Sequence, residues 1–163
     1  MKKLILNTML CSVLFIACKE GRIRSKFAGA WDVQRIEIIS FDNGIPSEEE
    51  IFNNIGQWSF LDNGLSNDTY NRSVLSLKES VPCLFNDALS LNGERYSGIV
   101  PWGPDEVSDK RIMFAYNGGQ EKVILDVEKI NRFTFVFTYL EQDPQEPDFL
   151  IRKERYVLKR TNR

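Results

Sequence analysis

Residues 132–140 read RFTFVFTYL, a run in which bulky aromatic side chains alternate with smaller ones. Successive side chains of an extended chain point to opposite faces. One face therefore carries Phe133, Phe135, Phe137 and Tyr139, and the other carries Thr134, Val136 and Thr138. This period of two predicts a β-strand whose aromatic face is turned toward a hydrophobic core.

Similar runs, rich in β-branched and aromatic residues, recur along the chain. With the first run they predict strands at residues 31–41, 57–61, 73–77, 111–116, 122–127, 132–140 and 149–158. Asn-Gly pairs lie between several of them, starting at Asn43, Asn63, Asn92 and Asn117. Both residues tolerate positive φ, which a type I′ hairpin turn requires. The chain therefore predicts an all-β domain of antiparallel hairpins.

Two segments with paired prolines are expected to be loops, because proline cannot donate to a strand ladder. The first is Asp143–Asp148, between the last two expected strands. The second is Pro101-Trp102-Gly103-Pro104. A loop there would expose Trp102, and surface aromatics often anchor protein interfaces. Trp102 is therefore a candidate partner contact, with the alternative that it closes one end of the domain.

One short helix is expected near residues 48–55. Ser47 and Glu50 have the spacing of a capping box, in which each side chain satisfies a free backbone N–H of the other's residue. The acidic first turn suits the positive end of a helix dipole. An apolar stripe then follows at Ile51, Phe52 and Ile55.

The first eighteen residues have the pattern of a secretory signal peptide. Two lysines precede an apolar run of roughly a dozen residues, shorter than the roughly 20 that a membrane-spanning helix needs. The run ends in Phe15-Ile16-Ala17 before Cys18. This ending resembles the lipobox of bacterial lipoproteins, in which the cysteine is acylated and becomes the first residue of the mature chain. The resemblance implies a signal peptide at 1–17, lipid attachment at Cys18, a tether at 18–28 and a folded domain at 29–163.

Charge argues against a nucleic-acid partner. Lys2 and Lys3 leave with the leader, so 19 basic and 23 acidic side chains remain, a net charge of −4. Binding to phosphates needs a basic face, and no run of Lys or Arg supplies one.

The chain contains no histidine. This excludes Ser-His-Asp and Cys-His catalytic sets and removes the commonest transition-metal ligand. We therefore expect a protein that is not an enzyme and that holds no metal or cofactor. Outside the leader and the acylation site, Cys83 is the remaining thiol. It is expected to be buried as a small apolar residue, although a reactive thiol or a bond between chains stays open.

From Gly29 to the C-terminus, the order of short motifs resembles that of the lipocalin-like lipoproteins common in Bacteroidota. The motifs are Gly29-Ala30-Trp31, WSFLDNG at 58–64, VEKINRFTF at 127–135 and RYVLKR at 155–160. The resemblance implies an antiparallel up-and-down barrel of about eight strands, with the helix covering one end. Closure of such a sheet removes exposed edges. It also implies that an arginine of the last strand, Arg155 or Arg160, packs over Trp31 as a cation on an indole face.

A barrel of this size is either filled by its own side chains or holds one small ligand. In the first interpretation the phenylalanines, Phe114, Phe133, Phe135 and Phe137, pack a core. In the second, an apolar pocket is lined by Trp58, Phe60, Phe114, Tyr116 and Tyr139, whose Trp and Tyr members add hydrogen-bonding tips.

These features predict a lipid-anchored, non-enzymatic, lipocalin-like protein in the cell envelope of a Gram-negative bacterium, at the outer membrane. Its expected partners are the membrane, through the anchor, and a small hydrophobic ligand inside the barrel. The alternative is a sandwich or barrel module with a dry interior that docks to a protein or glycan at the cell surface. A continuous cavity favours the carrier, and an exposed aromatic platform without a cavity favours docking.

Overall fold

The computed structural model describes residues 25–62, 71–105, 108–116 and 121–161. These residues form one antiparallel sheet and two single helical turns, at residues 25–27 and at η1 (Asn86–Ala88). The strands are β1 (Gly29–Asp42), β2 (Ile45–Phe60), β3 (Asn71–Leu77), β4 (Ser90–Asn92), β5 (Arg95–Asp105), β6 (Ser108–Tyr116), β7 (Glu121–Ile130), β8 (Thr134–Gln142) and β9 (Leu150–Arg160).

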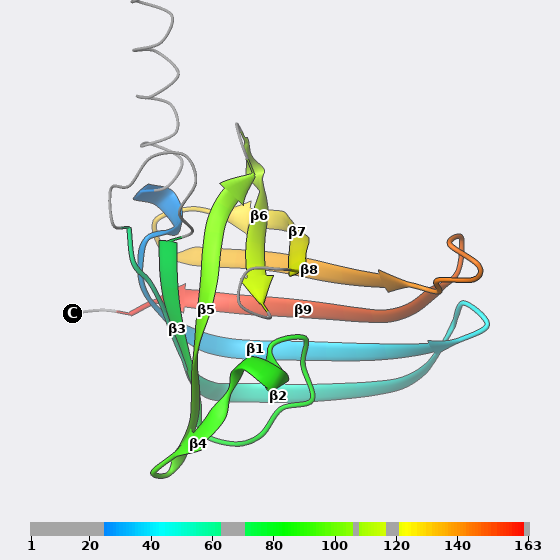
Figure 1. Ribbon diagram of the computed structural model, residues 1–163, viewed down its shortest axis with the longest axis horizontal. Coiled ribbons are helices and arrows are strands. Elements are labelled where there is room, and N and C mark those ends of the chain that lie inside the picture. Colours follow the sequence, from blue (N-terminus) through cyan, green and yellow to red (C-terminus); the bar gives the residue numbers. More distant parts are fainter. Residues whose placement is uncertain (1–24, 63–70, 106–107, 117–120, 162–163) are drawn as a thin grey trace, which may run out of the picture.

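The sheet closes into an eight-stranded up-and-down barrel (Figure 1). Each strand from β1 to β3 and from β5 to β9 pairs with its sequence neighbour, β3 pairs with β5, and β9 returns to pair with β1. The short strand β4 lies outside this ring and pairs with β5 alone. The predicted all-β antiparallel barrel is confirmed, and closure leaves most strands without a free edge.

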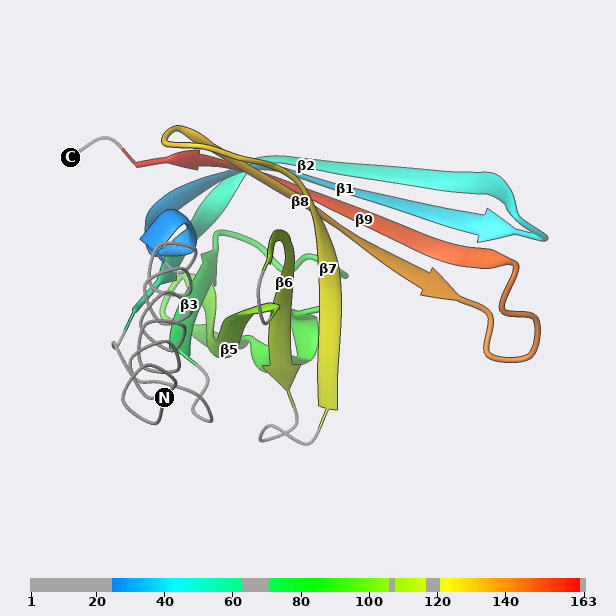
Figure 2. The same cartoon turned by 90° about the horizontal axis from the view of Figure 1, so that it is seen from above.

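Four of the strands continue beyond the barrel as a single layer (Figure 2). Strand β3 pairs with β2 only at Gly56–Phe60, and β7 pairs with β8 no further than Asp126 opposite Thr138. Past these rows, β1, β2, β8 and β9 pair only with one another. We call residues 38–50 and 139–154 the tongue.

Bulges mark the point where the tongue leaves the barrel. The register of β1 shifts between Val33 and Arg35 against both of its neighbours. On β2, Asn54 has a positive φ of 53° at the same level. An extra residue bends its strand and sharpens the local twist, so the sheet can divide there.

Of the two described Asn-Gly pairs, one forms the predicted turn. Asn43 and Gly44 have φ of 50° and 76° and join β1 to β2, as a type I′ hairpin requires. At the other, Asn92 ends β4 opposite Arg95, so Gly93 and Glu94 make the turn instead. The loop expected at Asp143–Asp148 does connect β8 to β9. Two other Asn-Gly pairs, at Asn63 and Asn117, lie outside the described residues.

The helix expected at residues 48–55 is wrong: these residues belong to strand β2. Ile36 and Ile38 of β1 lie opposite Phe52 and Glu50, and the Ser47 hydroxyl donates to the Ser40 carbonyl, 3.2 Å away, instead of capping a helix. Pairing with a long neighbouring strand outweighs a local helix preference of a few tenths of a kcal/mol per residue.

The loop expected at residues 101–104 is also wrong, because these residues lie within β5. Pro101 is opposite Arg72 and Pro104 is opposite Ile112. The register of β5 against β6 shifts directly after Pro104, so the ladder is already irregular there. A proline is tolerated where its missing N–H faces no acceptor or where the ladder bulges.

The run at residues 132–140 lies largely in strand β8, but the strand begins at Thr134, two residues later than expected. The Asn131 side chain accepts hydrogen bonds from the backbone N–H groups of Phe133 and Thr134 (2.8 and 2.9 Å), which makes a turn before the strand. Phe133 is consequently 62% exposed, whereas Phe135 and Phe137 are buried as predicted. An asparagine turn thus removes the first aromatic residue from the core.

Candidate functional site

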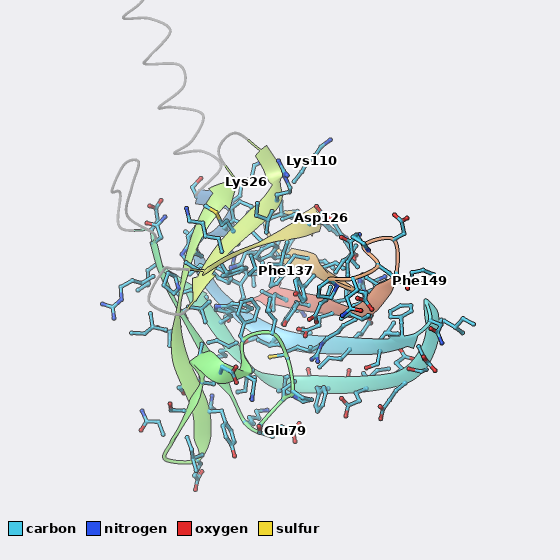
Figure 3. The ribbon with its side chains drawn as sticks, turned by 45° about the vertical axis from the view of Figure 1, so that its right-hand side comes forward. Lys26, Glu79, Lys110, Asp126, Phe137 and Phe149 are labelled. Carbon is cyan, nitrogen blue, oxygen red and sulfur yellow. The ribbon has the colours of Figure 1, made fainter. Side chains whose placement is uncertain are left out.

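The barrel interior is filled by one connected set of aromatic rings. Ten aromatic side chains are essentially fully buried: Phe27, Trp31, Trp58, Phe60, Phe85, Trp102, Phe114, Phe135, Phe137 and Tyr156. Neighbouring ring centroids lie 4.8–6.2 Å apart, within the usual range for aromatic pairs. Phe137, labelled in Figure 3, contacts four of these rings: Trp58, Phe114, Phe135 and Tyr156.

Three of the predicted ligand-binding residues, Trp58, Phe60 and Phe114, belong to this ring set. Trp58 stacks on Phe60 and Phe114, with centroids 5.1 and 5.2 Å apart. Of the other two, Tyr139 is half-buried on the tongue and packs against the same core. Tyr116 ends β6, and its side chain lies outside the described residues.

Each indole N–H of the interior already has an acceptor. Trp58 donates to the Ser73 hydroxyl (2.9 Å), and Trp31 donates to the Phe27 carbonyl (2.9 Å). Trp102 donates to the Leu61 carbonyl (3.2 Å). A ligand in the barrel would therefore meet rings whose polar tips are occupied, and its recognition would rest on apolar contact.

Trp102 is not at the surface, so the expected exposed position is wrong. Its side chain is 0% exposed and packs against Phe27 and Phe60, with centroids 5.9 and 5.4 Å away. Because residues 101–104 continue β5, alternation turns Trp102 inward. Trp102 thus helps to close the barrel, which was the alternative considered for it.

Two of the ten rings come from outside the strands, one toward each end of the barrel. Phe27 lies on the helical turn before β1, although residues 18–28 were expected to be a tether. Phe85 lies on the segment between β3 and β4. It makes edge contacts with Trp58 and Phe114 at 5.0 Å and with Tyr156 at 5.7 Å. We call residues 81–85 the plug.

A buried polar group on β9 holds the plug in place. The Glu154 carboxylate is fully buried and accepts the Leu84 backbone N–H at 3.0 and 2.9 Å. It also accepts from Arg152 Nε (2.7 Å) and from the Tyr156 hydroxyl. Arg152 in turn donates to the Pro82 carbonyl. We call Glu154, Arg152 and Tyr156 the latch. Glu154 and Arg152 form hydrogen bonds with the backbone of the plug, and Tyr156 donates to Glu154.

The plug also carries Cys83, which is 5% exposed and free, as predicted for a small buried residue. Burial, reinforced by the nearby Glu154 charge, raises the pKa of the Cys83 thiol from 9.0 to about 11. Burial, together with Cys83 and Glu154, also raises the pKa of Tyr156. Both groups therefore stay protonated at neutral pH, and Cys83 is a poor nucleophile in this conformation.

The opposite end of the barrel is closed by Trp31 and Arg160. The Arg160 guanidinium carbon lies 3.9 Å from the Trp31 ring centroid. Arg160 also donates to the carbonyl of Ala28 at 2.6 Å. The predicted arginine over Trp31 is confirmed as Arg160. Arg155 instead pairs with Glu128, its Nε lying 2.8 Å from a carboxylate oxygen.

Other parts of the described chain offer little chemistry. A solvent-open depression of about 200 Å³ on the barrel has a mixed polar lining that includes Asp32, Lys78 and Arg95. Among the described residues, no cluster of Cys, Asp and Glu has the arrangement of a metal site. Within the same residues, the structure contains no helix of the length and apolarity needed to cross a membrane. Cys18, the predicted lipid attachment residue, lies outside them.

Comparisons with known proteins add the following. No protein-family model matches the chain, and no curated protein matches it. Among solved structures, a redesigned β-barrel is similar over 86% of this chain and 96% of its own, with 14% identity and a TM-score of 0.40.

The plug and its latch were missed by sequence reasoning. One signal was present: alternation along β9 puts Arg152, Glu154, Tyr156 and Leu158 on one face. A carboxylate on the same face as two large apolar side chains indicates a buried polar partner. The identity of that partner, a backbone N–H seventy residues earlier, could not be derived from local pattern.

Proposed function

We propose that this chain is a lipid-anchored, non-enzymatic, lipocalin-like binding protein of the Gram-negative cell envelope, at the outer membrane. Its ligand would be a small hydrophobic molecule that enters the barrel at the plugged end. The observation that carries this proposal is Phe85, a ring of the interior set that is borne by a connecting segment. A segment without ladder bonds opens at lower free energy than the strands of a closed sheet.

Displacement of Phe85 would leave a ring-sized space lined by Trp58, Phe114 and Tyr156. The latch residues Glu154 and Arg152 would border its mouth. The lining favours a flat apolar group, because aromatic rings contribute about 0.5–1.5 kcal/mol per pair beyond the burial of area. In the resting protein, Phe85 itself occupies this position.

The anchor would fix how the barrel stands at the membrane. Acyl chains on Cys18 bind at about 0.8 kcal/mol per buried CH₂, and two or more chains give a stable tether. Lys26 and Phe149 lie toward opposite ends of the molecule in Figure 3, near the start of the described chain and at the tip of the tongue. A chain held through Cys18 would therefore direct its tongue away from the bilayer.

Ligand entry is tested by titrating the full-length chain with toluene, which is ring-sized, and with palmitate. A Cys11→Ser/Cys18→Ser form leaves Cys83 as the remaining thiol. We expect a saturable change in tryptophan fluorescence, since Phe85 contacts Trp58. We also expect faster modification of Cys83 as the plug moves, because its burial is lost.

The Phe85→Ala variant provides the matched comparison. Removal of a buried phenylalanine ring costs about 3–5 kcal/mol, and toluene should restore part of that loss in the variant. In the wild type, unchanged fluorescence and an unchanged Cys83 modification rate up to the solubility of both probes would show that the plug does not yield to a ligand. The interior would then be a permanent core.

The tongue favours a second candidate function, docking to a partner outside the barrel. It is a single sheet layer, and single layers in stable domains are normally covered by another element. This alternative does not require the plug to move.

A further inference from the structure

The tongue exposes apolar side chains that the rest of the described chain does not cover. Ile45 is 68% exposed, and Leu140 and Phe149 are also exposed. Phe149 packs on the opposite hairpin tip, against the position of Gly44, so the two hairpins support each other. The plug covers the tongue at Arg152 and Glu154, but beyond them the sheet is open and gains little from burial. The tongue is therefore an element whose second layer is missing.

The tongue also has a free strand edge, which continues past the tongue to Asn53. From Ile45 to Asn53, β2 pairs with β1 on one side, and no described strand pairs with it on the other. The edge ends where the Lys78 backbone N–H donates to the Ile55 carbonyl at 2.7 Å. Backbone N–H and C=O groups along such an edge are available to one further strand.

The charge of the tongue is strongly one-sided. Its residues 38–50 and 139–154 contain nine carboxylates and two basic side chains, a net charge of −7, whereas the whole chain has −2. One basic side chain, Arg152, is engaged by the buried Glu154 at 2.7 Å. At the free edge, Glu48 and Glu50 lie on the face of Ile38, and Glu49 lies on the face of Ile39. Carboxylates therefore flank the edge on both sides.

We infer that the free edge of β2 at residues 45–53 binds an extended, basic protein segment as an additional strand. Lysine or arginine side chains at alternate positions would meet Glu48 and Glu50 on one face and Glu49 on the other. Backbone bonds would supply affinity without a preformed pocket, as in other cases of strand addition. The inference rests on the docking function proposed above, and it specifies the partner as an extended, basic protein segment.

Charge decides between the possible occupants of the edge. A second copy would bring two tongues of net charge −7 together, and like charges oppose that contact. Pro46 and the three glutamates are features that protect an edge from pairing with itself. An anionic lipid surface would be repelled in the same way. A basic segment meets none of these obstacles.

The test uses the full-length chain and a synthetic peptide, KVKVKVKVK, at low ionic strength. We expect saturable binding and slowed hydrogen exchange at the backbone amides of residues 45–53. The same peptide N-methylated at alternate residues keeps its charge but loses the donors of one edge. It should bind about tenfold more weakly, because it lacks several of the backbone hydrogen bonds to the edge.

Two protein variants with the same change in charge separate the edge from general attraction. Glu48→Lys/Glu49→Lys/Glu50→Lys reverses the edge, whereas Glu79→Lys/Asp87→Lys/Glu94→Lys reverses exposed carboxylates on the barrel. Only the first should abolish binding. Equal binding of the methylated peptide, or protection outside residues 45–53, would overturn strand addition while leaving charge-driven docking in place. No binding of either peptide would overturn the inference and also remove the charge argument for docking.

Discussion

At the scale of single residues, polar side chains that contact the buried tryptophans also form hydrogen bonds with the backbone. Arg160 covers Trp31 and also donates to a backbone carbonyl. Ser73 accepts the Trp58 N–H and donates to the Val100 carbonyl (2.9 and 2.5 Å). Each of these bonds removes an unsatisfied group from the interior, where such a group would cost about 1–3 kcal/mol.

Arg160→Ala should lower the free energy of unfolding by about 2 kcal/mol. The loss combines a cation–π contact of about 0.5–2 kcal/mol with a hydrogen bond of about 1 kcal/mol. Urea unfolding measures it. Arg132→Ala is the control, because Arg132 lies over the exposed Phe133 ring at 5.6 Å and its removal should cost less than about 0.5 kcal/mol. Equal effects of the two substitutions would contradict the role of Arg160.

Cys83 should make the stability of the protein depend on alkaline pH. Its pKa is about 11 in the fold against an ordinary 9.0, so the unfolded chain loses the proton first as pH rises. The contribution is therefore complete below pH 9 and disappears between pH 9 and 11. Two pKa steps correspond to about 2–3 kcal/mol. Urea unfolding from pH 8 to 11 should show a loss larger by this amount in the wild type than in Cys83→Ala, which keeps the buried Tyr156. Parallel pH curves for the two proteins would exclude it.

At the scale of elements, the two faces of β9 make different contacts, one with the plug and the other with β7. One face carries Glu154 and Tyr156 to the plug. The other carries Arg155 to Glu128 of β7. Partial burial acts to raise the pKa of Glu128, but hydrogen bonds from Thr138 and Arg155 outweigh it and lower the pKa. Close approach of η1 to β5 completes this side of the barrel: any side chain at Gly98 would meet the Ala88 carbonyl. The plug is thus held from both ends of its segment.

Glu154→Ala should lower the free energy of unfolding by about 2–5 kcal/mol, because it leaves the buried Tyr156 hydroxyl and the Leu84 N–H without their acceptor. It should also speed modification of Cys83 under conditions that keep the fold intact, since Leu84 loses its acceptor. Glu154→Gln keeps an acceptor oxygen and should show a smaller increase. As a control, Glu49→Ala removes an exposed carboxylate and should change neither quantity. Equal modification rates in Glu154→Ala and the wild type would contradict the latch.

At the scale of the whole molecule, the described chain has two unlike ends. One end is the closed barrel, reached from the N-terminal side through Phe27 and sealed by aromatic rings. The other is the acidic, single-layer tongue (Figure 2). Such a separation of charge orients a molecule near a charged surface and steers partners toward one end. Ligand entry at the plug and docking at the tongue, the two functions proposed here, adjoin at Glu154 and Arg152, which belong to the tongue and bond to the plug.

Cys18→Ser should move the protein from the membrane fraction to the soluble fraction, because the acylated thiol is proposed to be its attachment. Mass spectrometry of the membrane-bound wild type should show an acyl-modified N-terminus at Cys18. Cys11→Ser lies within the expected leader and should leave both results unchanged. An unmodified N-terminus in the wild type would refute the anchor.

The sequence by itself determined the all-β class and the described Asn-Gly turn at Asn43. These features depend on alternation and on positive φ, which are readable locally. The arginine over Trp31 was implied by the family resemblance, and the structure selected Arg160 over Arg155. It failed at residues 48–55 and 101–104, where a helix preference and two prolines were overruled by neighbouring strands. Only the tertiary structure decided that Trp102 is buried, that Phe85 fills the barrel end and that four strands leave the barrel as a tongue. Each of these depends on contacts between residues far apart in the chain, and no local pattern records which distant strand supplies the partner.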